Sequence, residues 1–199
     1  MSIKIVKFGG SSIADTEKLH HVAGIIENMK KTSDIAIVLS ALGGVTDTIK
    51  TLAESAAAGK DIDSTFESLV TKHTKCAEEL SIKNDKNIRR ILDEYFTQLK
   101  SDLLFVVKER HLSSQSLDKV LSYGELLSTK ILAEYLCQIG MPAEQLDARK
   151  VILTDNYFGH AFVHYQESYN RIRSYFKDRS QIQVITGFLG STKTGETTT

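Results

Sequence analysis

The fold of this chain is decided by the stretch Ile3-Lys4-Ile5-Val6-Lys7-Phe8-Gly9-Gly10-Ser11-Ser12. Its apolar part, Ile3–Val6, predicts a short buried strand, and the glycine pair breaks the chain soon after it. A lysine followed by two glycines places a positive charge beside backbone without Cβ atoms, which a ligand phosphate can approach closely. In the common phosphate loop the lysine follows the glycines, so this spacing indicates a different phosphate site. On these residues alone, a β-turn-α corner with a solvated Lys7 is the alternative.

The segments that follow complete a βαβ unit. Apolar residues at helical spacing predict a helix over about 15–30, and Ile35–Leu39 is a continuous apolar run typical of a strand buried on both faces of a parallel sheet. A second glycine pair, Gly43-Gly44, follows this strand, and Asp47–Ala58 resumes as helix. Two strands thus end in glycine pairs. Ligands of open α/β sheets bind outside the carboxyl ends of the strands, so we expect a site there.

The remainder of the sequence is mainly helical. From residue 61 to residue 140 the pattern is helical, with breaks near 81–85 and 112–116. The apolar stripe between Ile88 and Leu103 is interpreted as a core face. Beyond Pro142 the pattern predicts, in order, a weak strand at Ala143–Leu146, a helix at Tyr165–Lys177 and a final strand at Ile182–Thr186.

Composition restricts the function. Lysine plus arginine (25) balances aspartate plus glutamate (25), so no global field favours nucleic acid or an anionic membrane. Cys76 and Cys137 lack a pairing or metal-binding spacing, and the opening apolar run is too short for a signal peptide or a membrane span. His160 and His164 lack a third ligand and are interpreted as surface residues, so we expect no metal site. We expect one soluble cytoplasmic domain, or most of one, acting on small molecules without a nucleic-acid or membrane partner.

Five motifs in order resemble the amino-terminal catalytic region of the aspartokinases. They are Lys7–Ser12, Val38–Ala41, Ser122–Ser128, Asp147–Lys150 and Gly187–Ser191, with Gly195–Thr199 in the final position. The resemblance covers the whole chain and is nearest to the lysine-sensitive types and those fused to a homoserine dehydrogenase. It implies an α/β, three-layer αβα amino-acid-kinase fold with a mostly parallel sheet and a long helical insertion.

The reaction that this resemblance implies is phosphoryl transfer from ATP, with Mg²⁺, to the side-chain carboxylate of L-aspartate. The product is 4-phospho-L-aspartate, the first step toward lysine, threonine and methionine. The aspartate carboxylate is already ionised near neutral pH and needs no general base, so catalysis reduces to positioning and charge neutralisation. We also expect a homo-oligomer, because a truncated domain would leave sheet edge and apolar surface exposed.

Site residues follow from the resemblance, beginning with the phosphate site. Lys7 is expected to be catalytic, bridging phosphate oxygens. The backbone N–H groups of Gly9 and Gly10 would lie beside it, and Ser11 would belong to the same ATP-binding site.

For aspartate, the resemblance points to five residues. Ser40 and Ala41 would line the pocket, Thr46 would hydrogen-bond the substrate, Glu125 would accept hydrogen bonds from its ammonium group, and Phe188 would border it. Four of them have a plain alternative on the residues alone: helix caps for the serine and the threonine, a solvated glutamate on an outer face, and ordinary packing for the aromatic.

The family pattern continues past the last residue of this sequence. After the threonine run, aspartokinases have a Gly-Arg-Gly-Gly-Ser-Asp segment, whose arginine holds the substrate α-carboxylate, then a nucleotide-binding half and ACT domains. Residues 1–199 are therefore interpreted as the aspartate-binding part of a truncated kinase domain, and we expect this chain to be inactive by itself. Two alternatives stay open: another amino-acid kinase, and a non-catalytic half-kinase binding module.

Overall fold

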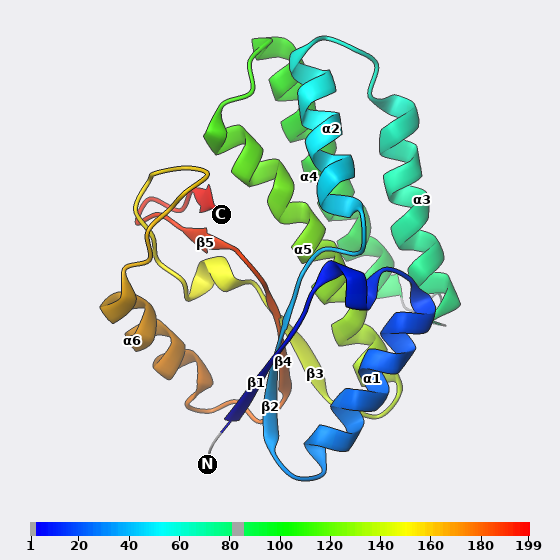
Figure 1. Cartoon of the computed structure of the whole chain (residues 1–199), viewed down its shortest axis with the longest axis vertical. Coiled ribbons are helices and arrows are strands. Elements are labelled where there is room, and N and C mark those ends of the chain that lie inside the picture. The colour runs from blue at the N-terminus through cyan, green and yellow to red at the C-terminus, as the bar shows by residue number, and fades with distance from the viewer. Residues whose placement is uncertain (1–2, 81–85) are drawn as a thin grey trace.

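A four-stranded parallel sheet forms the centre of the protein, in a computed structural model that describes residues 3–80 and 86–199 (Figure 1). The strand order is β1-β2-β4-β3, and all three neighbouring pairs are parallel. The strands are β1 Ile3–Phe8, β2 Asp34–Leu39, β3 Ala143–Leu146 and β4 Ile182–Thr186. The predicted α/β class, the βαβ unit and the strand at 143–146 are thereby confirmed.

The helices follow the predicted pattern closely. They are α1 Thr16–Lys30, α2 Val45–Ala57, α3 Asp63–Glu79, α4 Lys86–Glu109, α5 Ser114–Gln138 and α6 Tyr165–Phe176, with the short 3-10 helices η1 Gly10–Ile13 and η3 Ala148–Lys150. Asp15 caps α1 by accepting the N–H of Lys18 at 2.9 Å, and Ser113 caps α5 by accepting that of Ser116 at 3.0 Å. The predicted break near 112–116 is thus the start of α5, whereas the break near 81–85 lies outside the described residues.

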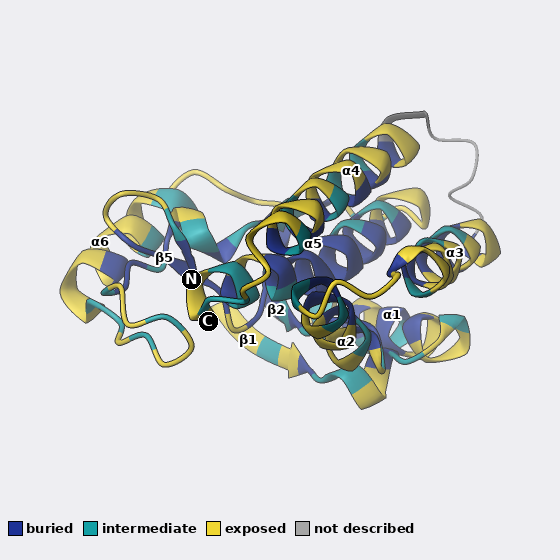
Figure 2. Cartoon of the chain, turned by 90° about the horizontal axis from the view of Figure 1, so that it is seen from above, coloured by how far each residue is buried: buried dark blue, intermediate teal, exposed yellow. Residues whose placement is uncertain are grey.

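Helices cover the two faces of the sheet unequally. Helices α1 and α5 pack on one face, and α6 lies on the opposite side (Figure 1). Helix α5 is buried along much of its length, between the sheet on one side and α2 and α4 on the other (Figure 2). One continuous apolar core fills this half of the molecule, and the stripe between Ile88 and Leu103 belongs to it. Any polar group on the inner part of α5 is therefore shielded from water.

Strand β1 differs from the prediction of a buried strand. It is an edge strand, and among its residues only Phe8 is buried, while Ile5 is 73 % exposed. Side chains alternate along a strand, so Ile5 and Lys7 lie on the sheet face opposite α1 and α5. The prediction was wrong because an apolar run does not reveal whether a strand has a neighbour on both sides.

The strand at 182–186 is also not the final one. Two short strands follow it, β5 Gly190–Ser191 and β6 Thr197–Thr198, which pair antiparallel. The polar tail is therefore an ordered hairpin, and Thr198 within it is fully buried.

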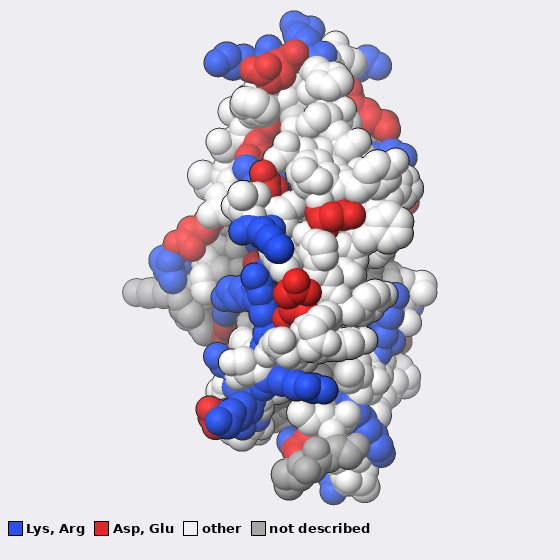
Figure 3. All heavy atoms as spheres, turned by 90° about the vertical axis from the view of Figure 1, so that its left-hand side faces the viewer, with Lys and Arg blue, Asp and Glu red and all other residues white. Residues whose placement is uncertain are grey.

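Two surface properties bear on partners. In the described ranges no helix is long and apolar enough to cross a membrane. On the α6 side of the molecule, basic and acidic side chains are interspersed (Figure 3). This mixture matches the balanced composition.

Candidate active site

The two glycine-containing loops meet at the carboxyl edge of the sheet. A Cβ on Gly10 would lie 3.2 Å from the carbonyl oxygen of Ala41, and a Cβ on Gly43 would lie 2.6 Å from the Cβ of Ala14. Gly43 leaves no room for a side chain, and a side chain at Gly10 would require the neighbouring backbone to shift by a few tenths of an ångström, because the two loops pack closely. The ends of β1 and β2 are thereby held in contact.

The predicted phosphate residues lie together at the end of β1. Lys7 is exposed, and Gly9 leads directly into η1, which begins at Gly10 and carries the exposed Ser11. The first turn of such a helix leaves backbone N–H groups without intrahelical partners. The exposure of Lys7 fits a phosphate contact and a solvated lysine equally, so its role stays a prediction.

Glu125 is the buried carboxylate of the site. Its side chain is 8 % exposed, and Oε1 accepts the N–H of Ala41 at 3.1 Å, which ties α5 to the end of β2. Ser128, one turn along α5, donates its hydroxyl to the carbonyl of Ser40 at 2.7 Å. A Cβ on Gly124 would lie 2.8 Å from the Cβ of Ala41, so glycine permits this close approach. The alternative of a solvated glutamate on an outer face is therefore wrong.

Burial decides the protonation of Glu125. Desolvation raises the pKa of its carboxyl from 4.5 to about 7, against the opposing effects of hydrogen bonds from Ala41 and Ser40. Near neutral pH this group is poised to ionise. A cation that approaches it would favour the ionised form, and the ammonium group of an amino acid is such a cation.

The other residues predicted for the aspartate pocket lie at the end of β2 or at the start of α2. Ser40 and Ala41 directly follow β2, and Ala41 is buried. Thr46 is exposed in the first turn of α2, whose N-cap is Gly44 with φ 78°. Since the cap is a glycine and α2 begins at Val45, the alternative that Ser40 or Thr46 caps this helix is wrong.

Phe188 follows β4 in an unusual conformation. It is 81 % exposed and has φ 65°, in the left-handed region that side chains rarely adopt. Gly187 before it donates its N–H to the carbonyl of Leu39 at 2.8 Å, which joins the ends of β4 and β2. Such strain costs about 1–3 kcal/mol and concentrates at functional sites. The alternative of ordinary core packing is wrong, because this ring lies outside the core.

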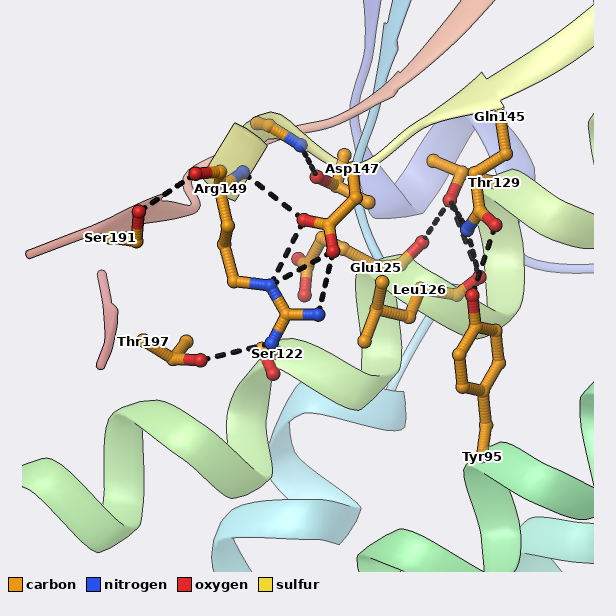
Figure 4. A network of polar contacts seen from close by, with 12 residues as sticks. Tyr95, Ser122, Glu125, Leu126, Thr129, Gln145, Asp147, Arg149, Ser191 and Thr197 are labelled. Atoms are coloured by element: carbon orange, nitrogen blue, oxygen red, sulfur yellow. Dashed lines mark hydrogen bonds and ion pairs between the residues drawn. The ribbon is translucent and has the colours of Figure 1, made fainter. Parts of the chain in front are cut away.

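Asp147 and Arg149, for which the sequence alone indicated no role, form the centre of a polar network (Figure 4). Arg149 donates from Nε and Nη2 to the Asp147 carboxylate, at 2.7 to 3.0 Å, and from Nη1 to the Thr197 hydroxyl at 2.9 Å. The network joins the end of β3 to strand β6. An acid two residues before an arginine, directly after a strand, was the signal available in the sequence.

A metal site is not apparent in the part of the chain that the structure describes. Within residues 3–80 and 86–199, no three His, Cys, Asp or Glu side chains are grouped so that they could hold an ion. His160 is exposed, and its ring lies 6.3 Å from that of Tyr157.

The chain belongs to the amino acid kinase family, whose sequence pattern matches residues 2–199. Within that family it is similar to aspartokinases. It is 32 % identical to aspartokinase 1, chloroplastic, of Arabidopsis thaliana, over 98 % of this chain and 35 % of that protein. It is 26 % identical to the lysine-sensitive aspartokinase 3 of Escherichia coli, over 99 % of this chain and 43 % of that protein.

Solved structures agree with this similarity. The structure of Escherichia coli aspartokinase III in complex with lysine and aspartate superimposes with a TM-score of 0.87 at 25 % identity, covering 99 % of this chain and 43 % of that one. Clostridium acetobutylicum aspartate kinase superimposes with a TM-score of 0.76 at 28 % identity, covering all of this chain and 41 % of that one. This chain thus spans 35 % to 43 % of the length of these relatives.

Proposed function

We propose that residues 1–199 form the amino-terminal, aspartate-binding part of an aspartate kinase domain. The reaction would transfer the γ-phosphoryl group of ATP to the side-chain carboxylate of L-aspartate, the first step toward lysine, threonine and methionine. The buried carboxylate of Glu125, held against Ala41 at the carboxyl edge of the sheet, carries this proposal. Solved structures of the similar Escherichia coli enzyme contain aspartate, in one case together with ADP, which supports it.

Glu125 would select the amino group of the substrate. Its carboxylate accepts one N–H from Ala41 and has oxygen lone pairs left for an ammonium group. Ser40 and Thr46 would contribute polar contacts from the end of β2 and the first turn of α2. Phe188, held outside the core, would cover the substrate and limit access of water.

Charge on the transferring phosphoryl group would be neutralised from the end of β1. The Lys7 ammonium would bridge phosphate oxygens, assisted by the N–H groups of Gly9 and Gly10 and by Ser11. Mg²⁺ would arrive bound to ATP, since the described residues offer no cluster of metal ligands. The substrate carboxylate would attack without a general base, because it is already ionised at neutral pH.

Binding of L-aspartate to this chain tests the proposal. Nuclear magnetic resonance titration at pH 8 should shift the amide signals around Ala41, and Glu125→Gln should weaken the affinity about tenfold or more by removing a charge-assisted contact. Glu134→Gln is the matched control, because Glu134 lies on the same helix and pairs with Lys130 instead. Equal affinities in the unchanged chain and Glu125→Gln would contradict the proposed role, and no binding at all would favour the non-catalytic module.

Turnover and assembly are separate questions. The arginine segment and nucleotide-binding half of the family pattern are not among these 199 residues, so we expect no acyl phosphate in a hydroxamate assay with ATP, Mg²⁺ and aspartate. Robust turnover would contradict this expectation.

We also propose that copies of the chain associate, because the exposed edge strand β1 and its Ile5 offer a surface for pairing. Light scattering measures the assembly directly.

A further inference from the structure

The threonine run at 197–199 is held by three separate parts of the chain. Each hydroxyl in the run has its own partner. In order, Thr197 binds Arg149 at 2.9 Å, Thr198 binds Thr154 at 2.8 Å, and Thr199 binds Asp118 at 2.5 Å. A polar tail with this many specific contacts is an ordered structural element, and its position is determined by the residues that bind it.

Asp118 makes the largest number of these contacts. Its side chain is 1 % exposed, near the start of α5. One carboxylate oxygen accepts the N–H of Gly159 at 2.9 Å and that of Thr199 at 3.1 Å, and the other accepts the Thr199 hydroxyl. Burial of a carboxylate is costly unless hydrogen bonds compensate it, and here three donors from two different segments do so. Asp118 therefore joins α5, the loop at 155–162 and strand β6.

This anchor lies on the same face of α5 as Glu125. The two residues are seven positions apart, which is close to two helical turns, or about 10 Å along the axis. Ser122, between them on that face, is fully buried. Strand β6 packs against α5, and its Thr197 contacts the guanidinium of Arg149 (Figure 4). The segments that Asp118 holds are thus attached to the same helix that carries Glu125, two turns before it.

We propose that Asp118 is a positioning residue of the aspartate site. It does not contact substrate; it fixes strand β6 and the 155–162 loop against the face of α5 that carries Glu125. This inference rests on the proposed function. A carboxylate suits the task because both of its oxygens accept and its charge strengthens the hydrogen bonds from all three donors, whereas an amide offers one oxygen and no charge.

Asp118→Asn tests the inference, with Asp102→Asn as the matched control. Asp102 accepts the Lys119 ammonium at 2.6 Å and the Tyr123 hydroxyl at 2.8 Å, so its variant also removes a carboxylate bound to α5 and leaves the contacts of Gly159 and Thr199 in place. We expect Asp118→Asn to raise the dissociation constant for L-aspartate about tenfold and Asp102→Asn to change it less than about twofold, although both lose stability.

Two further measurements test the role of Asp118. Amide hydrogen exchange of Gly159 and Thr199 should accelerate in Asp118→Asn and not in Asp102→Asn. If Asp118→Asn fails to fold, Thr199→Val removes one hydroxyl contact and should weaken aspartate binding in the same direction. If the unchanged chain binds aspartate and the folded variants bind it with the same affinity, the role of Asp118 is overturned and the proposed function is not. No binding by the unchanged chain would overturn the proposed function and this role together.

Discussion

Replacing Glu125 with glutamine should stabilise the folded chain while weakening its binding of aspartate. The side chain is 8 % exposed, and burial raises the pKa of its carboxyl from 4.5 to about 7. The folded protein therefore holds the proton more tightly than the unfolded chain does. Ionised Glu125 therefore opposes folding, which is consistent with the binding role proposed above.

The size and sign of the effect follow from this difference in pKa. Below about pH 4.5 the carboxyl is protonated in both states, and the free energy of unfolding contains no penalty from it. As the pH rises from 4.5 through 7, the unfolded chain releases its proton first and stability falls. At roughly 1.4 kcal/mol per pH unit, the full penalty is about 3 kcal/mol above neutral pH. Glutamine stays neutral and can still accept the N–H of Ala41, so it should escape this penalty.

Urea unfolding at several pH values between 5 and 8 measures the effect. Far-UV circular dichroism is a suitable probe because the chain has no tryptophan. The stability advantage of Glu125→Gln should be smallest at pH 5 and approach about 3 kcal/mol at pH 8. Glu134→Gln, which breaks the pair with Lys130 on the same helix, should instead lower stability by up to about 1 kcal/mol. An advantage that is equal at both ends of the pH range, or a loss of stability at pH 8, would refute the reasoning.

Three further predictions concern other positions. Gly124→Ala should cost about 1–3 kcal/mol in urea unfolding and weaken aspartate binding, because its Cβ would lie 2.8 Å from that of Ala41. Gly24→Ala, where a Cβ meets nothing within 4 Å, should stabilise α1 by about 1 kcal/mol and is its control. Phe188→Gly should relieve the strain at φ 65° and add about 1 kcal/mol while lowering aspartate affinity; lower stability would contradict the strain argument. Burial lowers the pKa of His73 from 6.5 to about 4, so the contribution of His73 to stability should fall as the pH falls through that interval, opposite in sign to the effect of Glu125. Urea unfolding of the unchanged chain and of His73→Leu isolates this contribution, and an equal pH slope in both would disprove the cause.

Local patterns were sufficient for most of the secondary structure. Helix α1 begins one residue from the predicted start and ends at the predicted residue. Its signals, the apolar spacing and the Asp15 cap, are carried by residues that are close together in the sequence. The glycine pairs marked the loops that pack together at the sheet edge. The burial of β1 was predicted wrongly, because strand order depends on β4 and β3, which come more than a hundred residues later in the chain.

The candidate site was predicted unevenly for the same reason. Lys7, Gly9, Gly10 and Ser11 are contiguous, so the sequence alone places them together. Asp118 was not predicted, because its partner Thr199 lies 81 residues away.

The sequence by itself determined the helices and the four strands of the parallel sheet, and it placed two glycine loops at strand ends, whereas the short strands β5 and β6 were not predicted. The spacing of apolar side chains and the conformational freedom of glycine are local properties, because they depend on residues that are neighbours along the chain. Only the tertiary structure decided that β1 lies at the edge and that Glu125 is withdrawn from water beside Ala41, 84 residues away in the chain. A carboxylate acquires a raised pKa, and a buried donor acquires its acceptor, only when distant segments exclude water from the space between them.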